Sequence, residues 1–219
     1  MPWKGYFDII NKCDLFVIYD EVQYTKNDWR NRNYINTKNG LQWLTVPVKH
    51  KSLDQSIDSI QIINNNWRKK HIRSIKQNYS KTLFLDYYFE RLKKIIIDEN
   101  SNLSDLNIKI IKEICSIIGI NTEIISSKEL KLEGDKNEKI IDACNKTNSN
   151  IYISGPSAKN YINESLFQEN QIEIKWMNYK TYPSYIQQNP KFFHNVSILD
   201  LIFNLGKETI NYISSDYEL

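Results

Sequence analysis

The length, composition and charge of the chain exclude several classes of protein. Its 219 residues suffice for one domain with a substantial core, and 41% hydrophobic with 25% charged residues is typical of a globular rather than a disordered chain. The formal net charge of +3 is too small to indicate the concentrated basic surface that binds DNA, although a single nucleotide or sugar phosphate would suit it.

The cysteines and the N-terminal residues bear on compartment and cofactors. Cys13, Cys115 and Cys144 are far apart and form no CxxC pair, so we expect reduced thiols rather than a zinc site or disulfides. We find no signal-peptide pattern and no run of about 18 apolar residues that could span a membrane. These features predict a cytoplasmic protein without membrane insertion.

The first 63 residues predict one short helix and two or three strands. A helix over 5–12 leads into a strand over 14–20, whose nearly continuous apolar residues are typical of a central parallel strand. A second strand is expected over 42–48, and Pro47 places it at a sheet edge or ends it, because proline cannot donate to a neighbouring strand. Residues 59–63 are compatible with a third strand.

A helical segment is expected over about residues 64–118. Its first helix starts at Asn66, and four residues spaced by four are predicted to form its buried face: Trp67, His71, Ile75 and Tyr79. A second helix is expected over 84–98. A third is expected to begin with Ser104 as its N-cap and to end at Gly119.

The last third of the chain alternates strands and helices. Strands are predicted over 122–126, 150–155 and 172–177, and helices over 136–146, 157–167 and 196–206, the last with Ser197 as its cap. Such alternation favours an α/β protein with a mostly parallel sheet in Rossmann-like or HUP-like layers. We expect a single domain over 1–219, with the helical segment as a subdomain.

Polar residues crowd the end of the strand over 14–20, where open α/β sheets bind ligands. These candidate residues are Asp20, Glu21, Gln23, Lys26, Arg30, Asn31, Arg32 and Asn33. In an extended chain the two arginines share one side and the two asparagines the other. Arginine suits phosphate or carboxylate, and asparagine suits amides or hydroxyls. The alternative is a polar loop whose arginines pair with Asp20, Glu21 or Asp28.

A second candidate site is the turn after the strand over 150–155. A helix beginning near Ser157 would offer free backbone N–H groups to an anion, and Gly155 would let the backbone approach it closely. Ser154 and Lys159 could add donors, whereas Pro156 contributes no N–H. The alternative is an ordinary strand–helix turn, since neither common phosphate-binding motif is present.

His71 is the third candidate. A neutral imidazole on the inner face of its helix could act as a general base, although such a histidine is more often a hydrogen-bonded core residue. The many aromatic residues could bind sugar rings or nucleobases, but core packing is their commoner role. Motifs such as HExxH, GxSxG and Cys/His clusters are missing, so no metal is expected.

Several stretches together resemble the WbqC-like family of bacterial proteins. They are GYFDIINKCDLFVIYDEVQYTKNDWRNRNYI, WLTVPV, IYISGPSAKNY and SILDLIFNLG, and they cover nearly the whole chain. Members of that family usually begin with an apolar strand and a QP dipeptide before the PW-GYF stretch, whereas here Met1 directly precedes PWKGYF. The family pattern falls on Asp20, Gln23, Lys26, Trp29, Asn31, Arg32, Asn33, His71, Ser154, Gly155, Ser157 and Tyr161.

The resemblance implies a role in the synthesis of O-antigen, a part of lipopolysaccharide, or of another surface polysaccharide. We expect a transferase that adds a glycyl-type acyl or aminoacyl group to the amine of a nucleotide-linked amino-deoxysugar. The expected co-substrate is an adenylate, a thioester or an aminoacyl-tRNA, with no tightly bound cofactor. His71 or Asp20 would accept the proton. The alternatives are a HUP-like adenylyl or nucleotidyl transferase and a non-catalytic protein that binds nucleotide sugars.

Overall fold

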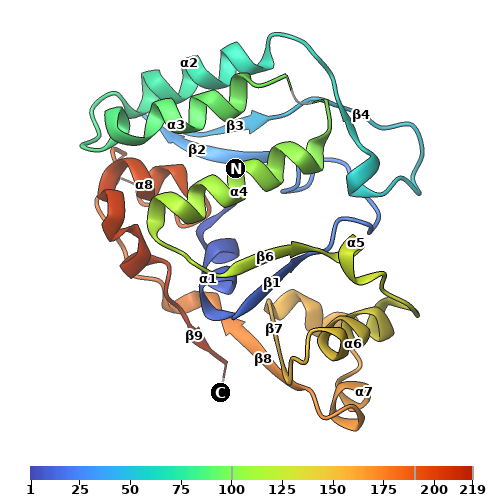
Figure 1. The fold of residues 1–219 in the computed structure, drawn as a ribbon. Coiled ribbons are helices and arrows are strands. Elements are labelled where there is room, and N and C mark those ends of the chain that lie inside the picture. Colours follow the sequence, from blue (N-terminus) through green and yellow to red (C-terminus); the bar gives the residue numbers. More distant parts are fainter. Residues whose placement is uncertain (100, 190, 219) are drawn as a thin grey trace. The chain divides into compact units, whose positions relative to one another are not determined.

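The computed structural model describes residues 1–99, 101–189 and 191–218 of an α/β protein (Figure 1). Its contacts divide the chain into two compact units, each described here by itself. The first unit comprises Met1–Phe7, Asp20–Asn121 and Pro183–Ile213. The second unit comprises Asp8–Tyr19, Thr122–Tyr182 and Ser214–Leu219. Helix α1 (Lys4–Lys12), predicted from the sequence, contributes its first four residues to the first unit and the others to the second.

An antiparallel hairpin is the main β-structure of the first unit. Strands β2 (Arg32–Thr37) and β3 (Gly40–Thr45) pair with Arg32 opposite Thr45 and Thr37 opposite Gly40. Gly40 has a φ of 101°, a conformation that glycine adopts without steric cost at such a turn. The sequence prediction did not include β2 as a strand.

The chain after the hairpin confirms the predicted effect of Pro47. Strand β3 ends before it, and a separate short strand β4 (Val48–Lys49) pairs with β5 (Gln61–Ile62) in antiparallel fashion. A 3₁₀ turn, η1 (Ile57–Ser59), precedes β5. The strand predicted over 42–48 is therefore two strands in different sheets.

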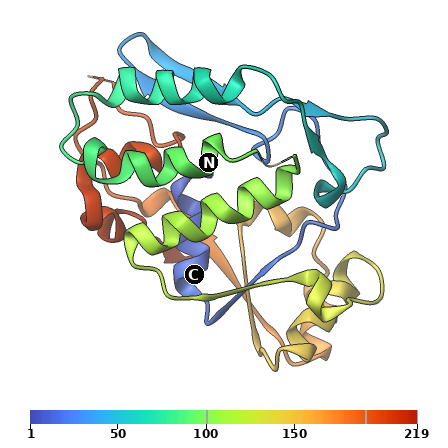
Figure 2. The same cartoon turned by 45° about the horizontal axis from the view of Figure 1, so that its top comes forward.

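Helices build the rest of the first unit. They are α2 (Trp67–Tyr79), α3 (Leu85–Ile97), α4 (Leu103–Ile118), α8 (Leu199–Leu205) and the 3₁₀ helix η4 (Gly206–Tyr212). Helix α3 lies between α2 and α4 and also contacts α8 (Figure 2). The predicted inner face of α2 is confirmed, because Trp67, His71, Ile75 and Tyr79 are its buried residues.

The ends of α4 confirm one prediction and correct another. Gly119 ends the helix in the left-handed conformation, with φ of 81°. Its N-cap is Asn102, whose side chain accepts hydrogen bonds from the backbone N–H groups of Ser104 and Asp105. Ser104, the predicted cap, instead lies in the first turn, and its hydroxyl donates to the Asp20 carboxylate.

The second unit contains the parallel strand pairs. Strand β1 (Leu15–Ile18) pairs with β6 (Glu123–Ser126), and β7 (Ile151–Ser154) pairs with β8 (Glu173–Asn178). Strand β9 (Asp216–Tyr217) adds to β8 in the antiparallel sense. Across the described residues the strands form four small sheets, so the predicted continuous, mostly parallel sheet is not confirmed.

Short helices complete the second unit. They are α5 (Ser127–Leu130), α6 (Lys136–Lys146), α7 (Glu164–Glu169), η2 (Pro156–Asn160) and η3 (Tyr179–Thr181). Ile141 and Cys144 of α6 pack with Phe167 and Ile172 in its core. The helix predicted over 157–167 is replaced by η2 and α7. No helix within the described ranges is long and apolar enough to cross a membrane.

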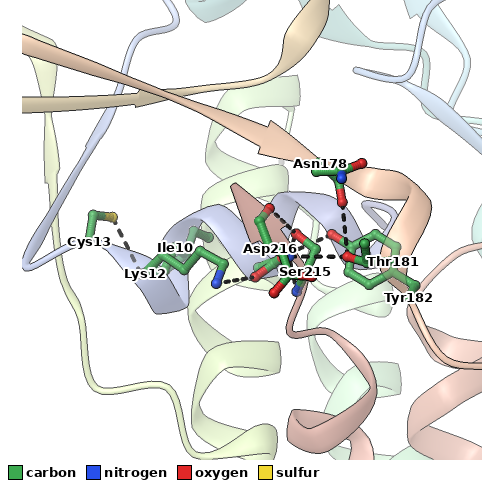
Figure 3. Close-up of polar contacts among 9 residues, drawn as sticks. Ile10, Lys12, Cys13, Asn178, Thr181, Tyr182, Ser215 and Asp216 are labelled. Atoms are coloured by element: carbon green, nitrogen blue, oxygen red, sulfur yellow. Dashed lines mark hydrogen bonds and ion pairs between the residues drawn. The ribbon is translucent and has the colours of Figure 1, made fainter. Parts of the chain in front are cut away.

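A buried carboxylate ties the C-terminal residues into the second unit. The Asp8 carboxylate accepts hydrogen bonds from the Tyr182 hydroxyl at 2.7 Å and from the Ser215 backbone N–H at 3.0 Å. The Lys12 ammonium lies 3.9 Å from its other oxygen. Figure 3 shows how Lys12, Tyr182 and Ser215 converge from three separate segments. Burial raises the pKa of Asp8, and these donors oppose that effect.

Candidate functional site

A small cavity lies inside the first unit, among the hairpin and the helices α2, α3 and α4. Its volume of about 20 Å³ is enough for about one water-sized group. Four residues that the sequence predicted for a site line it: Arg30, Asn31, Asn33 and His71. Trp67, Asn107 and Ser197 add further polar groups to the lining. No aspartate or glutamate of the described chain is among the lining residues.

His71 is held in one orientation within this cavity wall. Its Nε2 lies 3.1 Å from the Thr45 carbonyl oxygen, which can only accept, so Nε2 carries the proton. Nδ1 of the neutral ring is consequently an acceptor. Burial lowers the pKa of His71 to about 4, with the Thr45 contact opposing the shift, so the ring is neutral at pH 7.

Two buried polar atoms of the lining lack hydrogen-bond partners among the described residues. They are Oδ1 of Asn31 and Nε1 of Trp67. The other end of the Asn31 amide is fixed, because Nδ2 donates to the Val46 carbonyl at 2.9 Å. The Trp67 ring meets the His71 ring edge-on, with 4.9 Å between centroids. An unpartnered buried group costs about 1–3 kcal/mol, so such atoms indicate a missing partner.

The polar lining therefore offers a defined set of hydrogen bonds. Nε1 of Trp67 is a donor, and both Oδ1 of Asn31 and Nδ1 of His71 are acceptors. A group that both donates and accepts, such as an amine or a hydroxyl, matches this set. Arg30 connects the cavity to solvent, because it lines the cavity while 36% of its side chain is exposed.

The two arginines of the predicted cluster have different partners. Arg30 forms an ion pair with Asp28, which is one of the pairings that the polar-loop alternative expects. Arg32 places its guanidinium carbon 4.2 Å from the centroid of the Trp43 ring. Asn33 is buried on the opposite side of β2, as the alternation of an extended chain requires.

An exposed aromatic cluster lies next to these arginines. Trp29 is 56% exposed, and its ring centroid is 5.8 Å from that of Trp43. Tyr34 stacks on Trp43 with 3.6 Å between centroids. Trp29 and Trp43 are therefore available to a ligand, whereas Tyr34 mainly supports Trp43.

Comparisons with known proteins identify the family. The chain matches the WbqC-like protein family over residues 1–212. It belongs to the WbqC-like family. The WbqC-like resemblance predicted from the sequence is thus confirmed. A relative, the uncharacterized protein Rv1507c of Mycobacterium tuberculosis, is 42% identical over 215 residues, which are 97% of this chain and 93% of that protein. No solved structure matches.

Several predicted residues of this WbqC-like chain lie outside the cavity lining, among them Asp20, Gln23 and Lys26. The carboxylate of Asp20, the second catalytic candidate, accepts a hydrogen bond from the Ser104 hydroxyl. Asp20 does not line the cavity with His71. The side chain of Gln23 donates to the Leu53 carbonyl at 2.7 Å. Lys26 is exposed. Asp20 and Gln23 thus hold loop segments in place, and their proposed roles toward a ligand stay predictions.

The predicted anion site of the WbqC-like chain at residues 154–161 belongs to the second unit. Ser154 is buried at the end of β7, and η2 starts directly after Gly155. This 3₁₀ helix has only five residues, so its dipole is weaker than that of the helix we predicted. Lys159 pairs with Glu218, whereas Ser157 and Tyr161 are exposed. Anion binding here stays a prediction.

Sequence reasoning on the WbqC-like chain missed Trp67 and Asn107 as lining residues. The spacing of four residues placed Trp67 one helical turn before His71 on the same face, but the sequence analysis gave it no role at a site. Asn107 donates to the Arg30 carbonyl at 2.9 Å across 77 residues of sequence, and no local pattern signals that contact. The described residues contain no cluster of three or more His, Cys, Asp or Glu side chains that could hold a metal.

Proposed function

We propose that the chain transfers an acyl or aminoacyl group, of the glycyl type, to the amine of a nucleotide-linked amino-deoxysugar in surface-polysaccharide synthesis. Membership of the WbqC-like family supports the polysaccharide part of this proposal. The observation that carries the chemical part is the polar lining of the cavity. A neutral His71 and the unpartnered atoms of Asn31 and Trp67 fit a primary amine.

The size of the cavity fits the reacting group rather than the whole substrate. A volume of about 20 Å³ accommodates a group about as large as a water molecule, and an amino group has that size. The sugar ring would then lie outside, toward the exposed side of Arg30. The amine would donate to Nδ1 of His71 and to Oδ1 of Asn31. Its lone pair, which would accept from Nε1 of Trp67 in the bound state, would turn from that donor to the acyl carbon for attack.

The proposed reaction conserves atoms and charge as follows. The amine nitrogen attacks the acyl carbonyl carbon and forms the C–N bond, and the bond from that carbon to the leaving group breaks. The proton lost by the nitrogen moves to Nδ1 of His71 and then to the leaving group. An adenylate, a thioester or an aminoacyl-tRNA would supply the acyl group as co-substrate.

The low pKa of His71 is compatible with this role. A histidine with a pKa of about 4 is a weak base, but it is always in the acceptor form at neutral pH. The attacking amine becomes strongly acidic only as the C–N bond forms, so a weak base that is already aligned can take its proton. Lys26, Arg30 and Arg32 are proposed to hold the phosphates of the nucleotide.

A binding protein without catalysis is the second candidate function. The observation that favours it is the same low pKa, since a base of this strength contributes less to proton transfer than one near pH 7. In that case the cavity would only recognise the amine of a nucleotide sugar.

Mass spectrometry of the full chain with its two substrates separates these functions. Nucleotide-linked amino sugars would be incubated with glycyl and acetyl donors of each of the three classes. A product heavier by the acyl group, formed by the native chain and not by the His71→Gln variant, would support the transferase. The Tyr87→Phe variant, altered at an exposed ring of the same unit, is the matched control. Binding of the sugar without turnover for any donor would reject the transferase.

A further inference from the structure

Two segments of the first unit meet, and the first of them contains Arg30 and Arg32. They are residues 24–32 and residues 48–51, and the rings of Tyr24 and His50 lie 5.3 Å apart at the contact. The sequence analysis placed neither of these two residues in a candidate site. The backbone N–H of Tyr24 donates to the Gln55 carbonyl at 2.7 Å, which fixes this part of the chain.

Three buried polar atoms in these segments lack partners among the described residues. They are the Tyr24 hydroxyl, Nε of Arg32 and Nε2 of His50. Tyr24 is only 2% exposed, so its hydroxyl cannot rely on bulk water. Each of the three atoms can act as a donor, and leaving several donors unsatisfied close together is costly. A single group that completed all three contacts would therefore have to accept hydrogen bonds.

The charge of the two segments indicates that this acceptor is an anion. Their basic residues are Lys26, Arg30, Arg32, Lys49 and Lys51, and their one acidic residue is Asp28. The Asp28 carboxylate already accepts from Arg30 and from the Trp29 backbone N–H at 2.6 Å. Burial and, next, the Asp28 carboxylate raise the pKa of Tyr24, whereas Arg30 and Arg32 lower it, so the hydroxyl lies near one anion and two cations.

The neighbouring tryptophan adds a planar surface. Trp29 lies between Asp28 and Arg30 in the chain, and more than half of its surface is exposed. Stacking on an exposed aromatic ring is the usual way for a protein to hold a base without reading its sequence. Cationic donors beside an exposed indole suit a ligand with both a phosphate and an aromatic ring.

We propose that Tyr24, Arg32 and His50 bind the phosphates of a nucleoside diphosphate, with Arg30 at the edge of the site and Trp29 stacking on the base. This inference rests on the proposed function, because it assigns the nucleotide part of the same sugar substrate. It adds Tyr24 and His50 as ligand-binding residues and gives Trp29 a defined partner.

Calorimetric titration of the full chain tests the proposal with three probes: UDP or GDP, inorganic pyrophosphate, and uridine or guanosine. We expect the Tyr24→Phe variant to bind both UDP or GDP and pyrophosphate about 10-fold more weakly, as loss of a hydrogen bond to a charged group predicts. The matched control Tyr87→Phe removes a hydroxyl from a 74% exposed tyrosine and should bind like the native chain. His50→Gln should repeat the loss while keeping a polar side chain.

The Trp29→Ala variant distinguishes a nucleotide from a free phosphate. We expect it to weaken nucleotide binding about 10-fold and to leave pyrophosphate binding unchanged. Equal affinities of Tyr24→Phe and Tyr87→Phe would overturn the proposal, as would a Trp29→Ala variant without effect on the nucleotides. Urea unfolding of each variant checks that the fold is retained.

These results are independent of the acyl-transfer assay. Native nucleotide affinity with no turnover for any acyl donor would reject the transferase and support the nucleotide site. Acyl transfer by Tyr24→Phe with a native KM for the nucleotide sugar would support the transferase and reject the nucleotide site.

Discussion

The first unit contains two buried polar groupings that differ in how far they satisfy their own hydrogen bonds. One is the carboxylate of Asp200, whose two oxygens accept the hydroxyls of Tyr79 at 3.0 Å and Tyr185 at 2.7 Å. Gln187 completes this grouping by donating to the Tyr185 hydroxyl at 2.9 Å. The other is the lining of the cavity around His71.

The Asp200 grouping is nearly complete: among the described residues, Oδ1 of Asn36 at its edge is its one buried side-chain atom without a partner. In the cavity lining, both Asn31 and Trp67 have an atom without a partner. A complete network stabilises the fold, whereas an incomplete one at a cavity is suited to a ligand. The contrast predicts that the first grouping carries stability and the second carries binding.

The largest expected effect is on turnover at the cavity. His71→Gln can still donate to the Thr45 carbonyl but offers no basic nitrogen, so kcat should fall by about 100-fold to 10,000-fold. The KM for the nucleotide sugar should change by less than about 5-fold. Steady-state kinetics measures both, and an equal loss in kcat and in affinity would remove His71 from the mechanism.

The next largest effect is expected on the stability that the Asp200 grouping contributes. Asp200→Ala leaves the buried hydroxyls of Tyr79 and Tyr185 without their acceptor, so the free energy of unfolding should fall by about 2–4 kcal/mol. Urea titration measures it. Tyr87→Phe serves as a surface control, and a loss below about 1 kcal/mol would contradict the structural role of Asp200.

The pH dependence of stability sharpens the same point. Burial raises the pKa of Asp200 to about 6, while the hydrogen bonds from Tyr185 and Tyr79 limit the shift. The folded-state pKa lies above the unfolded value of 3.8, so the protonated carboxyl of Asp200 contributes to the free energy of unfolding. That contribution is complete below about pH 4 and is lost as the pH rises through about 6. The native chain should lose on the order of 2 kcal/mol relative to Asp200→Asn between pH 4 and pH 7. Parallel stability profiles would contradict this.

The smallest effect is expected from Trp67→Phe in the cavity. The variant removes an unpartnered buried N–H, which is stabilising, and leaves a smaller ring, which is destabilising. The free energy of unfolding should therefore change by less than about 1 kcal/mol. Affinity for the amino sugar should fall about 5-fold, since one donor to the ligand is lost. Thermal unfolding with and without the sugar would show whether ligand stabilisation alone is reduced.

Regular patterns of the sequence predicted α2 and the end of α4, but the helix expected over 157–167 was wrong. The four-residue spacing that begins at Trp67 and the glycine at 119 correctly located α2 and the end of α4. Strand β2 was missed because its buried residues include Asn33 and Asn36, which lie on opposite faces and hide the apolar alternation of a strand. The Asn39–Gly40 pair before β3 was the signal available for the hairpin.

The candidate site was predicted only where its residues are neighbours in sequence. The string that contains Asn31 and Asn33 could be recognised locally, and His71 stood out on its helix. The contact of Tyr24 with His50 joins residues far apart in sequence, and such pairs depend on the tertiary fold. Asp20 follows the end of β1 as predicted, but only the fold shows that Ser104 is its partner.

The position of Trp67 gives the chain an intrinsic optical reporter. Of its five tryptophans, all within the described residues, Trp67 alone is buried, and its ring lies at a steep angle to the His71 imidazole. Light emitted by an indole shifts in wavelength when water or a polar group reaches its N–H. Arrival of an amine in the cavity can therefore be followed from the blue edge of the emission spectrum, with no dye attached.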